Sequence, residues 1–120
     1  MPDIDSQRLA LRPVLDLPAA TTPEERFQNA TLRPIMKQQD ALLRAALGIF
    51  LTKRKVKLDQ IPANQRFAKV KELVTRDNRL RGLLFGIAVG QFTADEMTYY
   101  AANEREANRR MTNLLVERLA

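Results

Sequence analysis

The 120-residue sequence predicts an all-α protein, a compact bundle of four to five helices with an extended N-terminal arm. Apolar residues recur at helical spacing in several windows, and no window alternates as a half-buried strand does. Helix-start signals stand at residues 22–25 (TPEE), at Asp77 and at residues 93–96 (TADE). With 45% hydrophobic residues, a chain of this length can bury one core.

The first 22 residues are expected to form an extended or flexible arm, because prolines interrupt them and no helical period is sustained. Residues 23–120 then form a single helical domain that begins after the capping residue Thr22. Pro34 falls inside the apolar pattern of residues 23–53. This segment is therefore either one kinked helix or two helices broken near Arg33.

Three further helices are expected after residue 53. One follows Pro62 and continues to about Arg76, and Asp77 caps a second one over residues 78–90. The last helix is expected over residues 94–119, where apolar residues keep a period of about 3.6 almost to the end of the chain.

Residues 81–92, RGLLFGIAVGQF, place a glycine at every fourth position of an apolar helix. Because no side of this helix is polar, we expect it to be buried all round at the centre of the bundle. An interior glycine costs about 1 kcal/mol relative to alanine, and tight packing of Gly82 and Gly86 against another helix of the monomer would offset that cost. A contact between subunits and room for a ligand are the alternatives. Gly90 is expected to end the helix in the left-handed conformation.

The composition excludes several classes of function. The chain has no cysteine and no histidine, which excludes disulfides, thiolate chemistry, the usual zinc sites and histidine acid–base catalysis. We find no phosphate-binding loop and no pair of facing acids, so we expect no catalytic residue, metal or cofactor. The uncharged run within residues 82–92 is shorter than the roughly 20 residues of a membrane span. The acidic start does not resemble a signal peptide, so a cytoplasmic location without membrane contact is expected.

The positive charge is concentrated in one region of the chain. Residues 53–81 hold ten basic and three acidic side chains, while the formal charge of the whole chain is +6. An acidic partner or nucleic acid would be contacted by Lys53, Arg54, Lys55, Lys57, Arg66 and Lys69. The alternative is a solvated helix end, since lysines also favour the negative end of the preceding helix.

Polar residues interrupt the apolar line of the last predicted helix. Glu104 and Asn108 lie between apolar positions, and together with Tyr100 they are candidates for lining a small polar pocket. The alternative is that Glu104 remains in solvent or forms a structural ion pair. A small-molecule ligand is therefore not the expected partner.

Three segments carry a resemblance to a known family: residues 31–47 (TLRPIMKQQDALLRAAL), 76–93 (RDNRLRGLLFGIAVGQFT) and 103–119 (NEREANRRMTNLLVERL). They are similar to small, uncharacterised, all-helical bacterial proteins, some of which carry a glyoxalase label. The resemblance implies an all-helical fold. Metal-dependent glyoxalases resemble βαβββ modules with histidine and glutamate ligands, and this chain has no histidine, so no functional residue is carried over.

The favoured interpretation is a noncatalytic interaction or assembly module that self-associates through helical packing, with a dimer as the favoured homo-oligomer. One alternative is electrostatic binding of nucleic acid through residues 53–81. Another is a small-ligand binder or enzyme built around Glu104.

Overall fold

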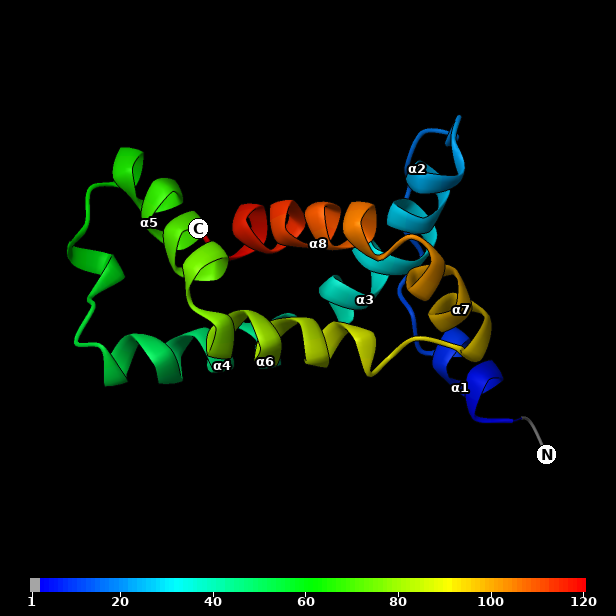
Figure 1. The fold of residues 1–120 in the computed structure, drawn as a ribbon, viewed down its shortest axis with the longest axis horizontal. Coiled ribbons are helices and arrows are strands. Elements are labelled where there is room, and N and C mark those ends of the chain that lie inside the picture. The colour runs from blue at the N-terminus through cyan, green and yellow to red at the C-terminus, as the bar shows by residue number, and fades with distance from the viewer. Residues whose placement is uncertain (1–2) are drawn as a thin grey trace.

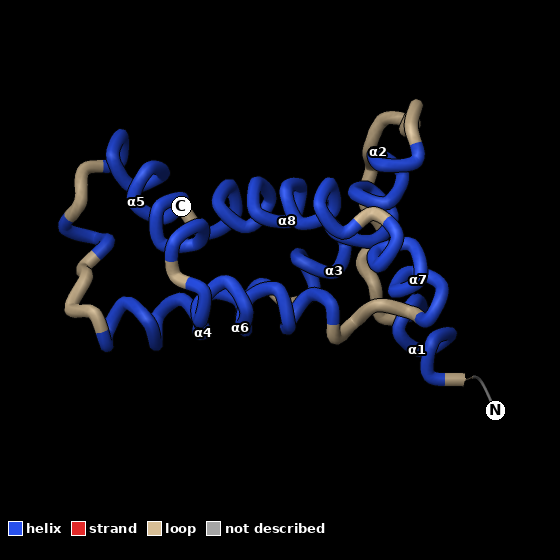
Figure 2. Tube along the Cα trace, in the orientation of Figure 1, coloured by secondary structure: helices blue, strands red, loops and turns tan. Residues whose placement is uncertain are grey.

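A computed structural model describes residues 3–120 as helices joined by short loops, without a strand in that range (Figure 1, Figure 2). Met1 and Pro2 of the expected arm lie outside the described residues. The all-α prediction is confirmed, although there are more helical segments than the expected four to five. They are α1 (Ile4–Ala10), α2 (Pro23–Phe27), a π-helical turn η1 (Gln28–Leu32), α3 (Arg33–Gln38), α4 (Asp40–Lys53), a 3₁₀ turn η2 (Leu58–Gln60), α5 (Ala63–Arg76), α6 (Asn78–Val89), α7 (Ala94–Ala102) and α8 (Glu104–Leu119).

The helices form an elongated body of 47 × 32 × 27 Å. α4 and α6 pack against each other and run in opposite directions, and α8 lies along one side of this pair (Figure 1). α5 packs on α8 and α6 at one end of the molecule. α1, α2, η1, α3 and α7 gather at the other end (Figure 1).

The core is built around α8, which buries more side chains than any other helix among the described residues. These are Ala107, Met111, Leu114, Leu115, Val116 and Leu119. The sequence analysis instead expected the helix over residues 78–90 to be the centre. Its counterpart α6 buries only Leu80, Leu84 and Ala88, which lie one turn apart on a single side of the helix.

The expectation that the glycine-containing helix is buried all round is wrong. Gly82, Gly86 and Gly90 are exposed, and a Cβ atom added at Gly82 or Gly86 would meet no atom within 4 Å. The expected tight packing within the monomer is therefore absent at Gly82 and Gly86. Gly90 also differs from the prediction, because its φ of −60° and ψ of −15° are right-handed rather than left-handed.

Pro34 does not break the helix that contains it. Helical backbone continues from α2 through the π-helical turn η1 into α3, and the break falls at Gln39, where φ is −94° and ψ is 13°. Because the helix is continuous here, Pro34 lacks an N–H that would bond the preceding turn, and the wider π turn before it accommodates both this missing bond and the proline ring.

The single helix expected over residues 94–119 is two helices, α7 and α8. Asn103 separates them with φ −133° and ψ 33°, and its Nδ2 donates to the Tyr99 carbonyl oxygen at 2.9 Å. An asparagine side chain that bonds nearby backbone competes with the helix in this way. Asn103 followed by Glu104 and Glu106 is also a helix-start pattern, which is the signal that the sequence analysis missed.

The N-terminal segment differs from the extended arm that the sequence predicts. Residues 4–10 form α1, and Pro13–Ala20 has neither helix nor strand. The segment is tied to the start of α7, since the Ala94 N–H donates to Asp5 Oδ2 at 2.9 Å. Arg12 also donates to the Gln91 carbonyl oxygen at 3.1 Å.

Glu96 holds three parts of this end of the molecule together. Its carboxylate accepts two 2.6 Å hydrogen bonds from Arg12, one of 2.6 Å from Thr31 Oγ1 in η1, and one of 2.8 Å from the Thr93 N–H. Thr93 Oγ1 in turn accepts from the Glu96 N–H, which completes the capping box predicted at residues 93–96. Burial raises the pKa of Glu96, but the hydrogen bonds from Arg12, Thr31 and Thr93 outweigh it and leave the pKa below its usual 4.5.

Replacing Glu96 with glutamine is expected to lower the free energy of unfolding by about 3 kcal/mol, because the Arg12 guanidinium, only 6% exposed, loses its charged partner. A lowered carboxyl pKa stabilises the fold above the unfolded-state pKa, and that stability is lost as pH falls through the folded-state value. Chemical denaturation from pH 7 to pH 3 should therefore show a flatter acid limb for Glu96→Gln than for wild type. Glu72→Gln, at an exposed residue of α5 without an ion pair among the described residues, is the control. Equal losses in both variants would contradict the role of Glu96.

α4 ends in a left-handed residue that is not glycine. Lys55 has φ 55°, its N–H donates to the Thr52 carbonyl oxygen at 3.2 Å, and the Val56 N–H donates to that of Leu51 at 2.9 Å. These two bonds form a Schellman motif, in which glycine is the usual left-handed residue.

Replacing Lys55 with glycine is expected to raise the free energy of unfolding by about 1 kcal/mol, because glycine has no Cβ to oppose positive φ. Thermal denaturation checks this. Lys55→Ala removes the same charge without freeing the backbone, so it should not stabilise the protein. A gain of equal size in both variants would mean that loss of the lysine charge, and not relief of the left-handed backbone, stabilises the protein.

Candidate functional site

An apolar surface is left uncovered on the side of α4 and α6 opposite α8. Its large side chains are unusually exposed: Leu42 is 58% exposed, Ile49 53% and Leu83 43%. Ala45, Gly86 and Gly90 are also exposed. We call these six residues the α4–α6 outer face; none of them carries a charge.

The position of Leu42 and Ile49 follows from the contacts of α4. Residues of an α-helix advance by about 100° each, so Leu42 and Ile49 share one flank, and Asp40 and Arg44 share the opposite one. Asp40 accepts from Arg118 of α8 at 3.1 Å, and Arg44 donates to the Arg118 carbonyl oxygen at 2.9 Å. Leu42 and Ile49 therefore face away from α8.

The same argument places Leu83 and Gly90 of α6. Arg81 and Phe85, on the opposite flank of α6, line a hollow together with residues of α8. Leu83 and Gly90 therefore also face away from α8. Because α4 and α6 are neighbours, the two exposed flanks form one continuous surface.

The register between α4 and α6 decides which residues of the two helices lie level with one another on this surface. An ion pair joins Arg54, just after α4, to Asp77, just before α6. In an antiparallel pair, one step back along α4 corresponds to one step forward along α6. Ile49 is therefore about level with Leu83, Ala45 with Gly86, and Leu42 with Gly90. Along α4 a small position, Ala45, lies between two large side chains, whereas along α6 one large side chain, Leu83, is followed by Gly86 and Gly90.

The basic region does not form one free stripe. Arg54 pairs with Asp77 and lies over the Phe50 ring at 5.0 Å, while Arg66 donates to the carbonyl oxygens of Leu58 and Ile61 at 3.1 Å each. These arginines hold the connection between α4 and α5. Lys53, Lys55 and Lys57 are exposed, and Lys69 is half-buried. Binding of nucleic acid or of an acidic partner here stays a prediction.

The three residues predicted for a polar pocket do lie together. Tyr100, Glu104 and Asn108 line an open hollow of about 470 Å³. The Tyr100 hydroxyl donates to Asn108 Oδ1 at 2.6 Å. Burial raises the pKa of Tyr100, and the nearby charge of Glu104 raises it further, which keeps this hydroxyl a donor. Glu104 is exposed and forms no ion pair within residues 3–120.

A scan against protein-family models, a search of curated proteins and a search of solved structures each gave no significant match to the chain. The resemblance to the bacterial helical family therefore stays a prediction. No helix in the described part of the chain is both long and apolar enough to cross a membrane.

Replacing Gly82 with alanine is expected to raise the free energy of unfolding by about 1 kcal/mol, since the added methyl group enters open space and alanine favours the helix. Chemical denaturation at low protein concentration checks this. Ala68→Gly, at an exposed position within α5, should lower the free energy of unfolding by a similar amount. If Gly82→Ala instead destabilises the protein, the result would support the tight packing of Gly82 that the sequence predicts.

Proposed function

We propose that the protein is a noncatalytic assembly module that forms a homodimer through the α4–α6 outer face. The observation that carries the proposal is the exposure of three large aliphatic side chains, Leu42, Ile49 and Leu83, on one surface that the exposed Lys53 and Arg79 border at one end. Contiguous apolar surface of this kind typically marks an interaction site. On the evidence of the sequence alone, we place this assembly in the cytoplasm.

A second copy fits this face because the face holds both projections and notches. In a two-fold dimer the same surface meets itself, so each copy must supply complementary features. Leu42, Ile49 and Leu83 are the projections, and Gly86 and Gly90 are positions where no side chain obstructs a partner. A dimer contact would also explain why glycines persist on an exposed helix that alanine would stabilise.

The expected dimer is weak. A two-fold dimer covers three large aliphatic side chains from each copy, and the loss of translational and rotational freedom offsets much of the free energy that their burial contributes. We therefore expect a dissociation constant in the high micromolar to millimolar range.

Sedimentation velocity and light scattering from about 20 μM to 1 mM test the proposal. Wild type should shift from 13.7 kDa toward twice that mass as the concentration rises. Leu83→Glu should weaken the dimer by at least about tenfold, because association would bury an unpaired charge. Leu9→Glu is the matched control, since Leu9 is 53% exposed on α1, away from the face.

A wild-type mass of 13.7 kDa across the whole range would reject the homodimer. Equal weakening by Leu83→Glu and Leu9→Glu would reject the α4–α6 outer face as the contact.

A further inference from the structure

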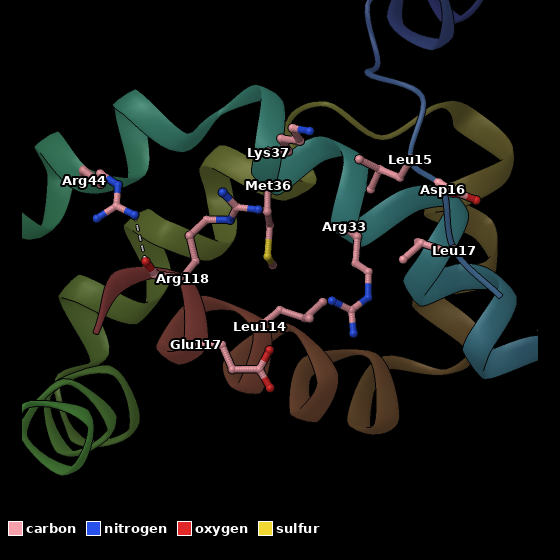
Figure 3. Close-up of a pocket in the computed structure, with 10 residues that line it drawn as sticks. All are labelled: Leu15, Asp16, Leu17, Arg33, Met36, Lys37, Arg44, Leu114, Glu117 and Arg118. Atoms are coloured by element: carbon pink, nitrogen blue, oxygen red, sulfur yellow. Dashed lines mark hydrogen bonds between the residues drawn. The ribbon is translucent and has the colours of Figure 1, made fainter. Parts of the chain in front are cut away.

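A hollow of about 440 Å³ opens between the extended N-terminal segment, α3, α4 and the end of α8 (Figure 3). This volume lies in the range of small-molecule sites. It is separate from the α4–α6 outer face, because α4 contributes to it through Arg44, on its flank toward α8. The sequence analysis did not single out a site here.

Arg33 is the feature of this hollow that lacks a partner. Its side chain extends from α3 toward Leu114 of α8 (Figure 3). Its Nε atom, like that of Arg12, is buried without a hydrogen-bond partner within residues 3–120, and Arg33 forms no ion pair with the described residues. A buried unmatched donor is costly, and a guanidinium presents its donors as a fork that fits a carboxylate.

The other charged groups leave the hollow with positive character. Arg44 and Arg118 both bond Asp40, so their charges are partly offset. Lys37 forms no ion pair within the described residues. Asp16 and Glu117 also line the hollow, but both are exposed and neither pairs with Arg33.

Apolar side chains form the remaining walls. Leu15 and Leu17 of the extended segment lie on one side of Arg33, and Met36 and Leu114 lie on the other (Figure 3). A fully hydrated ion such as inorganic phosphate would make no apolar contact with these walls. An anion with an apolar body would contact them and Arg33 together.

We propose that this hollow binds a small organic carboxylate with an apolar body. The carboxylate accepts hydrogen bonds from the Arg33 guanidinium, with Lys37 adding attraction. The apolar body lies against Leu15, Leu17, Met36 and Leu114. Residues 15–17 and α3 thus form a ligand site with the end of α8.

Titration of ¹⁵N-labelled full-length protein with octanoate, followed by amide chemical shifts, tests this proposal. Saturable shifts are expected at residues 15–17, 33, 35–37 and 114–118. Octanamide, the uncharged isostere, and acetate, which lacks the apolar body, should each bind at least about tenfold more weakly. These two comparisons need no mutation.

Substitutions test whether Arg33 makes the charged contact with the octanoate carboxylate. Arg33→Gln should weaken octanoate binding by about tenfold or more, while Arg105→Gln, an exposed arginine on α8 outside this hollow, should leave it unchanged. Glu117→Gln should tighten binding, because it removes a competing carboxylate. Equal affinity for octanoate and octanamide, unchanged affinity in Arg33→Gln, or shifts confined to other surfaces would overturn the proposal. Should Arg33→Gln fail to fold, the wild-type comparison of the three ligands decides alone.

Discussion

The fold depends on one constraint: α8 lies along one side of the α4–α6 pair, and no helix of the described residues lies along the opposite side (Figure 1). Both α4 and α6 are apolar around most of their circumference, but α5, which is as long as α4, packs on α6 and α8 at one end of the molecule. Leu43 and Leu84 are buried on the covered side, whereas Leu42 and Leu83, adjacent in sequence, remain exposed on the other. The monomer therefore leaves apolar surface uncovered for geometric reasons, and a second copy is the simplest cover for it.

Two arginines near the start of α3, Arg12 and Arg33, have contrasting surroundings. Two hydrogen bonds join Arg12 to the Glu96 carboxylate, which also binds Thr31, and this ion pair fixes the N-terminal segment, although Arg12 Nε itself is buried without a partner within the described residues. Arg33, on α3, has no such match within the described residues. The difference between the two arginines is the ion pair: Arg12 has a carboxylate partner in the fold, whereas Arg33, beside a hollow with apolar walls, has none within the described residues, which is why we propose that a ligand carboxylate meets it.

Sequence reasoning succeeded where structure is local. Thr22, Asp77 and Thr93 were identified as helix caps, and each accepts the expected backbone hydrogen bond. It failed where a tertiary contact decides. A helix wheel cannot say which apolar side of α6 meets α8, and Arg33 looks like an ordinary surface arginine until the fold places apolar walls around it. Tyr100 and Asn108 were expected near each other on one continuous helix, but their hydrogen bond joins two helices, α7 and α8, across the break at Asn103.

The claim that a second copy covers the α4–α6 outer face is tested most directly by isotope-filtered nuclear Overhauser measurements on an equal mixture of ¹³C-labelled and unlabelled protein. Contacts between molecules should arise from the methyl groups of Leu42, Ile49 and Leu83. The claim would be contradicted if, at concentrations where the mass has doubled, such contacts came instead from Leu9 or Val14 at the N-terminal end.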